Sequence, residues 1–260
     1  NTYEPAVDFV EICNENGLLS AGGLSKLDEL PDVFLVLFRR HWNDWLAARY
    51  GTTGDLRRAW AKGAQPLGGE MLADGDSPAT LDDWQLQNNA GAQSTVSLSD
   101  DVPEGAGKSI QVKVAAEGSG PWHVLLNRLG FDLVAGHAYT LRFWAKADAA
   151  RTVRMRFAQT HPPFTNLSPG IVAEVSPEWR QFRFVLTATA DEQGARIMIG
   201  DLGKGLGTYW LAGMSLRPGG IEGLAADESP GDGSVPLLLV NLFADRTAAA
   251  KRDWVEFLRE

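Results

Sequence analysis

A run of short alternating segments occupies residues 81–217 and constrains the fold more than any other feature of the sequence. In each segment apolar residues recur at every second position, with polar residues between them. This period of two is typical of a β-strand that buries one face and exposes the other. The clearest apolar positions are Ile110, Val112 and Val114; Leu141 and Phe143; Val153, Met155 and Phe157; Phe182, Phe184 and Leu186; and Ile197 and Ile199.

Glycine and proline turns separate these segments, as at Pro103-Glu104-Gly105 and Ala135-Gly136. Many short strands of even spacing predict a mainly β fold, an antiparallel β-sandwich of the jelly-roll type. The sequence also predicts α/β segments on either side of this sandwich.

Nine tryptophans are a high count for 260 residues. Trp144, Trp179 and Trp210 lie in segments of strong apolar pattern, so we interpret them as structural residues of the strands. Trp122 follows Pro121, and two interpretations stay open for it: a core residue at the start of a strand, or an exposed platform for a ligand.

Composition restricts the class of partner. The formal net charge of −9 disfavours nucleic acid, because phosphate binding needs a basic face. The single cysteine excludes an internal disulfide, and apolar runs fall far short of the roughly 20 residues of a membrane helix. The sequence therefore indicates no membrane partner. We also predict no metal and no cofactor; a structural calcium ion is compatible with the sequence but is not indicated by it.

The flanking segments have a different character. Residues 6–13 read as a buried strand that ends at the polar pair Asn14 and Glu15. Apolar residues three and four apart predict a helix over residues 32–50 that stops at Gly51, and a shorter helix over residues 53–60 with Thr52 or Thr53 as its cap. An extended segment and a final helix are expected within residues 235–260.

Shifts in composition predict the domain boundaries. Glycine, proline and aspartate interrupt the helical pattern at residues 66–80, and residues 219–234 form an acidic, glycine-rich stretch. The expected order is therefore a partial α/β segment at 1–65, a linker at 66–80, a sandwich at 81–218, a linker at 219–234 and a return segment at 235–260.

Three stretches of the central block resemble carbohydrate-binding modules of the family 4/9/22-like type. They are residues 136–147 (GHAYTLRFWAKA), 177–182 (PEWRQF) and 208–216 (TYWLAGMSL). The resemblance covers about residues 71–218 and implies binding of a plant-type polysaccharide or oligosaccharide. One departure is Ala212-Gly213, where the family commonly carries an aspartate.

Sugars present flat apolar faces rimmed by hydroxyls, so their sites combine aromatic planes with hydrogen-bonding side chains. Two clusters of this kind lie at residues 121–127 and 159–166. Because strand residues alternate between faces, the polar members of the first cluster and the arginines of residues 153–157 are expected on one outer face. The predicted sugar site consists of Trp122, His123, Asn127, Arg156, Gln159, His161 and Phe164.

The flanks resemble another family. VEICNENG at residues 10–17 and WNDWLAARYG at residues 42–51 are similar to the fourth strand and following helix of clan A retaining glycoside hydrolases with a TIM barrel. The resemblance implies that Glu15 is the general acid/base and that Asn14 contacts a sugar hydroxyl. It makes the sandwich an insertion within a fragment of a barrel, comprising about residues 1–65 and 235–260.

Retaining hydrolysis needs a second carboxylate about 5 to 5.5 Å from the first, and no later segment reads as the strand that would carry it. Three hypotheses follow. The chain binds polysaccharide within a secreted or periplasmic hydrolase; it is itself a glycosidase using Glu15, with Asp32, Glu70 or another chain supplying the partner carboxylate; or its sandwich binds protein. Self-association through the apolar face of residues 34–45 is also expected.

Overall fold

The structure is a computed structural model that describes residues 30–72, 78–120, 122–239, 243 and 245–260. Asn14 and Glu15, the predicted catalytic pair, lie outside the described residues. The chain forms two compact units, one of residues 65–221 and one of residues 1–64 with 222–260. Within the described part, no helix is both long and apolar enough to cross a membrane.

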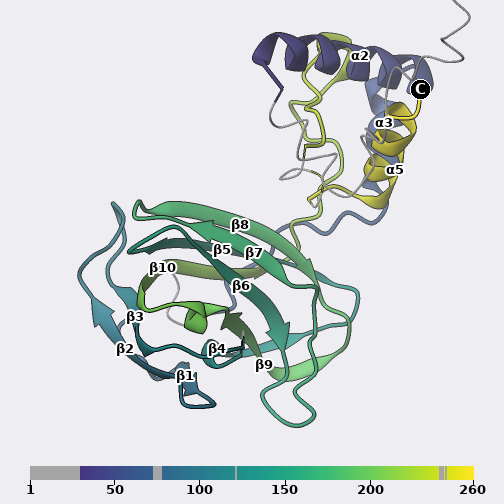
Figure 1. Cartoon of the computed structure of the whole chain (residues 1–260). Helices are drawn as coiled ribbons and strands as arrows, with labels where there is room; N and C mark the ends of the chain where they lie inside the picture. Colours follow the sequence, from purple (N-terminus) through teal and green to yellow (C-terminus); the bar gives the residue numbers. More distant parts are fainter. Residues whose placement is uncertain (1–29, 73–77, 121, 240–242, 244) are drawn as a thin grey trace, which may run out of the picture. The chain divides into compact units, whose positions relative to one another are not determined.

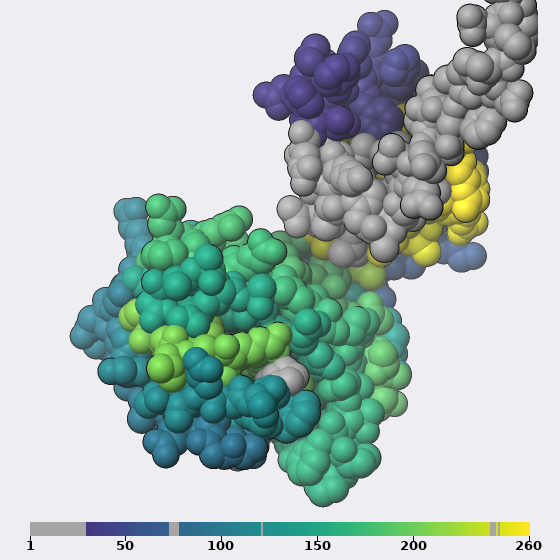
Figure 2. Space-filling model, viewed as in Figure 1, coloured from purple at the N-terminus to yellow at the C-terminus, as the bar shows by residue number. Residues whose placement is uncertain are grey.

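The first unit is an antiparallel β-sandwich of two five-stranded sheets, as the alternating pattern predicts (Figure 1). Strands consecutive in sequence often lie in different sheets, and the surface is assembled from segments far apart in the chain (Figure 2). Sheet one has the spatial order β1 (Trp84–Asn88), β4 (Val124–Leu133), β9 (Glu192–Gly200), β6 (Arg151–Ala158) and β7 (Ile171–Val175). Sheet two has the order β2 (Gln93–Ser99), β3 (Ser109–Ala116), β10 (Gly207–Pro218), β5 (Ala138–Ala147) and β8 (Arg180–Thr187).

The core between the sheets is built from the apolar positions of the alternating pattern. Phe143 of β5 and Phe157 of β6 are fully buried. Phe143 stacks on Phe182 of β8 with ring centroids 5.3 Å apart. A short 3-10 helix, η1 (Leu202–Lys204), joins β9 to β10.

The three tryptophans interpreted as structural lie outside this core. Trp144 of β5, Trp210 of β10 and Trp179, just before β8, are all half-exposed. The phase of the strands explains the difference, because Trp144 follows the inward-facing Phe143 and so points to the outer face of sheet two. Lys146 lies over the rings of Trp179 and Trp210, at 5.2 and 4.9 Å from their centroids.

Part of the segment expected as a linker pairs with the sandwich. The Gly68 amide donates to the Pro218 carbonyl at 2.7 Å, and the Met71 amide donates to the Leu216 carbonyl at 2.9 Å. Glu70, one suggested partner for Glu15, accepts from the Leu216 amide at 2.9 Å. Its carboxylate is therefore engaged in holding residues 68–71 against β10.

The second unit, called the helical unit below, contains α2 (Asp32–Tyr50), α3 (Thr53–Ala61), η2 (Pro230–Asp232) and α5 (Ala248–Phe257). The first two helices match the predicted ones. Gly51 ends α2 with a φ of 73°, which glycine adopts without strain. The Thr52 hydroxyl accepts from the Asp55 amide at 3.1 Å and so caps α3.

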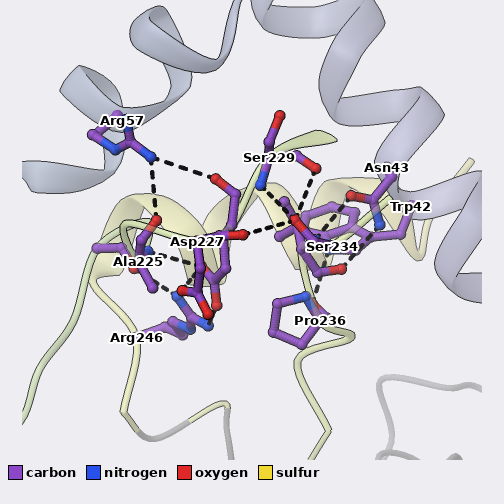
Figure 3. A network of polar contacts seen from close by, with 12 residues as sticks. Trp42, Asn43, Arg57, Ala225, Asp227, Ser229, Ser234, Pro236 and Arg246 are labelled. Carbon is purple, nitrogen blue, oxygen red and sulfur yellow. Dashed lines mark hydrogen bonds and ion pairs between the residues drawn. The ribbon is translucent and has the colours of Figure 1, made fainter. Parts of the chain in front are cut away.

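A shared core joins the segments before and after the sandwich into this one unit. Trp42, Trp60 and Trp254 are fully buried, and the rings of Trp42 and Trp254 meet edge to face at 5.0 Å. In the polar network of Figure 3, the Asn43 amide donates to the Val235 carbonyl at 2.9 Å and accepts from the Val235 amide at 3.1 Å. The sandwich is thus inserted into a discontinuous unit.

Candidate functional site

A cavity of about 200 Å³ opens on the outer face of sheet one. Its walls come from β4, β6 and β9, from the segment just before β4, and from the segments that follow β6 and β9. The lining residues are Trp122, Leu125, Arg154, Arg156, Asn166, Met198, Gly200 and Asp201. We call this cavity the sheet-one pocket.

Strand register explains why these residues meet. Arg154 pairs with Gly200 and Arg156 with Met198 across β6 and β9. Their neighbours in sequence, Met155 and Phe157, fill the core, so the two arginines point outward from the same face. Gly200 is buried and carries no side chain, so its backbone forms part of the pocket lining.

Asp201 occupies a special backbone position at the end of β9. Its φ is 66°, a left-handed conformation that aspartate tolerates better than most residues. The side chain is 2% exposed and lies 3.5 Å from Arg154 Nε and 3.0 Å from Lys204 Nζ through Oδ2. Its other oxygen, Oδ1, has no hydrogen-bond partner among the described residues. Asp201 therefore brings a buried, unsatisfied acceptor to the pocket.

Two of the predicted site residues line the pocket. Trp122 is 59% exposed, which supports the platform interpretation over the core one. Arg156 is half-buried, and its guanidinium lies against Gly170, where an added Cβ would come within 3.1 Å of Nη2. The pocket thus combines an exposed aromatic plane with a cation.

His123 and Asn127 are instead covered by their neighbours. The buried His123 ring accepts a hydrogen bond from the Gly120 amide through Nδ1 at 3.1 Å. The loop can lie this close to the ring because residues 118 and 120 are glycines, where a Cβ would press against His123. The fully buried Asn127 donates to the Gln85 carbonyl of β1 at 3.3 Å. Strand alternation predicts the face of the sheet on which a residue lies but not what covers it. Because both side chains are buried and hydrogen-bonded to neighbouring backbone, they hold the structure around the pocket.

Gln159, His161 and Phe164 form a second group further along β9. Gln159 and His161 each hydrogen-bond to Glu192 at 2.8 Å. Phe164 is 53% exposed and lies 5.7 Å above the guanidinium of Arg196. Arg196 is two residues from Met198 and four from Gly200 on β9, so this group lies roughly 7 to 13 Å along the strand from these two residues of the sheet-one pocket.

Arg196 is buried beneath Phe164, and its Nε has no hydrogen-bond partner among the described residues. Burial lowers the pKa of its guanidinium. Sequence reasoning missed Arg196 and Asp201. Arg154 and Asn166 lie within the ranges 153–157 and 159–166 but were not among the predicted site residues.

The His161–Glu192 contact predicts a measurable titration. The pKa of the His161 imidazole is raised, first by its hydrogen bond to the Pro162 carbonyl and then by Glu192. We expect an NMR titration to give a pKa above the ordinary value of about 6.5, and Glu192→Gln to shift it back towards that value. An unchanged pKa in the variant would contradict the contact. Because the folded pKa is raised, the stabilisation is complete below about pH 6.5 and is lost as pH rises through the folded value.

The described residues contain no group of three or more histidine, cysteine, aspartate or glutamate side chains that could hold a metal ion.

Comparisons with known proteins give a matching family model and several similar solved structures. Among solved structures, the chain is similar to one described as "CBM4 structure and function", at 24% identity over 52% of this chain and 86% of that chain, with a TM-score of 0.44. It is also similar to the N-terminal cellulose-binding domain of β-1,4-glucanase C from Cellulomonas fimi, at 21% identity over 57% of this chain and 96% of that domain, with a TM-score of 0.43.

A third similar structure is an arabinose-bound MgGH51 α-L-arabinofuranosidase. The match has 18% identity, covers 65% of this chain and 30% of that chain, and has a TM-score of 0.48. No curated protein sequence was found to match the chain. A family model described as a carbohydrate binding domain, CBM 4/9, matches residues 70–200, about half of the chain. The chain therefore belongs to the CBM 4/9 family of carbohydrate-binding domains.

Proposed function

We propose that the outer face of sheet one binds a polysaccharide chain, with the sheet-one pocket as its central subsite. The observation that supports this best is the exposed indole of Trp122 at a cavity whose other walls carry Arg154, Arg156 and Asp201. An aromatic plane packs against the apolar face of a sugar ring, while the polar groups hydrogen-bond to its hydroxyls.

The second exposed aromatic, Phe164, extends the proposed surface. A chain that runs along β9 from the sheet-one pocket reaches Phe164, whose ring lies over the guanidinium of Arg196. We propose that these two rings form the ends of one extended site. Gln159 and His161 hold the Phe164 loop through Glu192 and so act as positioning residues.

Affinity electrophoresis in β-glucan, xylan and mannan tests this function. We expect retardation in at least one polymer, and a loss of about tenfold in affinity for Trp122→Ala, because an aromatic contact of this kind contributes about 1 kcal/mol or more. Trp179→Ala is the matched control, since Trp179 belongs to the side of sheet two.

The two variants distinguish the sheets. If Trp179→Ala weakens binding and Trp122→Ala does not, the sugar binds on sheet two and the proposal is wrong. Binding of none of the three polymers would count against carbohydrate binding by the sandwich and in favour of a protein-interaction module.

We further propose that the helical unit belongs to a retaining glycoside hydrolase, acting outside the cytoplasm, in which Glu15 is the acid/base and Asn14 assists it. The discontinuous core supports this proposal, because it makes the sandwich an insertion within another folded unit. Turnover of aryl glycosides that is abolished by Glu15→Gln would support it, and turnover that persists in the variant would contradict it.

The start of α2 is a candidate for the expected self-association. Phe34 and Leu37 are 56% and 50% exposed, whereas Trp42 and Leu46 on the same helix are fully buried. We propose that this apolar end contacts a second copy, or the rest of a barrel, because such a stripe is unfavourable in water. Phe34→Ser combined with Leu37→Ser should then abolish any dimer detected by analytical ultracentrifugation.

A further inference from the structure

The charges of the sheet-one pocket do not balance. Two arginines and one aspartate line it, and Lys204 also reaches that aspartate, so the cations outnumber the carboxylate. Arg154 is paired with Asp201 at 3.5 Å, and Lys204 reaches the same carboxylate at 3.0 Å. Arg156 has no carboxylate partner and no hydrogen bond among the described residues. Arg154 and Lys204 therefore share one carboxylate, and Arg156 is the cation of the pocket without a carboxylate beside it.

Arg156 is also partly removed from water. It is half-buried on β6, opposite Met198 of β9 and against Gly170. A cation in such a place is stabilised most by an anion that replaces its lost hydration. A carboxylate fits the planar guanidinium because the two groups form paired hydrogen bonds, and it is the anion that a uronic-acid residue of a polysaccharide carries.

The other walls suit a sugar ring that carries this carboxylate. Trp122, Leu125 and Met198 provide apolar surface, and Asp201 Oδ1 offers a buried acceptor without a partner among the described residues. A ring hydroxyl can donate to that oxygen. A polar group buried without a hydrogen bond is costly, so satisfying Oδ1 favours binding.

We propose that the sheet-one pocket takes a uronic-acid residue of an acidic polysaccharide, with the sugar carboxylate on Arg156 and a ring hydroxyl on Asp201. This inference rests on the proposed function, since it assigns a ligand class to the same site. The net charge of −9 repels a polyanion at long range. The preference must therefore arise from contacts inside the pocket.

Isothermal titration of the full chain tests the proposal with two acidic polymers, glucuronoxylan and polygalacturonate. Each is compared with its own carboxyl-reduced form, which keeps the backbone and removes the charge. We expect at least one acidic polymer to bind about tenfold more tightly than its reduced form, as charge-assisted hydrogen bonds do relative to neutral ones. Arg156→Gln should remove that difference, so that the acidic polymer and its reduced form bind the variant with equal affinity.

Arg180→Gln is the matched control, because Arg180 is an exposed arginine of β8 in sheet two, and its preference should equal that of the unmodified chain. Thermal melting confirms that each variant is folded. Equal binding of acidic and reduced polymers would overturn the uronate assignment while leaving carbohydrate binding intact. A preference that survives Arg156→Gln would also overturn it. Failure to bind any acidic, reduced or neutral polymer would instead overturn the proposed function.

Discussion

Replacing Asp253 by alanine is expected to lower the stability of the helical unit by about 3–5 kcal/mol, the usual cost of breaking a buried ionic network. The Asp253 side chain is only 4% exposed. It accepts from the Tyr50 hydroxyl at 2.6 Å and from Trp60 Nε1 at 2.7 Å, and it lies 3.3 Å from Arg49 Nε. The alanine variant leaves the Tyr50 and Trp60 donors without a partner.

The change should have consequences beyond one helix, because Asp253 follows the sandwich in sequence and its partners precede it. Losing this carboxylate weakens the joint between the two halves of the discontinuous unit. Hydrogen exchange of the α3 and α5 amides measures the effect locally. We expect faster exchange in both helices and unchanged protection in the core strands of the sandwich.

Two variants sharpen this experiment. Asp253→Asn keeps the size and one acceptor oxygen, so its loss should be smaller than that of alanine. Asp44→Ala removes an exposed carboxylate, 71% accessible and 4.0 Å from Arg40, and should change stability by no more than about 0.5 kcal/mol. Equal protection in the alanine variant and the parent chain would show that Asp253 does not hold the halves together.

The sandwich could be predicted from sequence because one physical rule dominates it. Period two assigns Phe143 and Phe157 to the core, and both are fully buried. The same rule, applied to Trp144, assigns it to the outer face. We interpreted Trp144 as structural because it lies in a segment of strong apolar pattern, but the phase of the strand decides which face of the sheet its side chain points to.

The burial of the site residues was harder to predict than the face of the sheet on which they lie. Asn127 lies on the same face as Leu125, as expected. However, β1 lies beside it, and the Asn127 side-chain amide donates to the Gln85 carbonyl of that strand. Coverage of this kind depends on a segment about forty residues away in sequence, which local patterns do not reveal. Asp201 lies just beyond the end of β9 with a positive φ, so strand alternation does not predict the direction of its side chain.

The flanks show a different limit. Helical periodicity predicted α2 and α3 closely, since capping by Thr52 and termination by Gly51 are local effects. The identity of the partner that buries Trp42 is not local. It proves to be Trp254 of α5, more than two hundred residues later, together with Trp60. Only the fold brings these rings together.

Phe157→Ala is expected to destabilise the sandwich by about 3–5 kcal/mol, because it empties a large, fully enclosed volume. Phe157 is 0% exposed. Its ring meets Phe131 of β4 at 5.7 Å and Tyr139 of β5 at 5.8 Å, both edge to face. The side chain thus joins the two sheets directly beneath the strand that carries Arg154 and Arg156.

The variant also separates stability from binding. Arg156 precedes Phe157 on β6 and keeps its register through β9, so we expect the affinity for polysaccharide to change little at temperatures where the sandwich is still folded. Calorimetric melting should show the sandwich transition at a temperature lower by roughly 10 °C, and Val172→Ala, at an exposed position of β7, should leave it in place. A melting temperature as high as that of the parent chain would mean that Phe157 does not hold the sheets together. A lost affinity in the folded variant would mean that the outer face depends on core packing more strongly than the strand pairing implies.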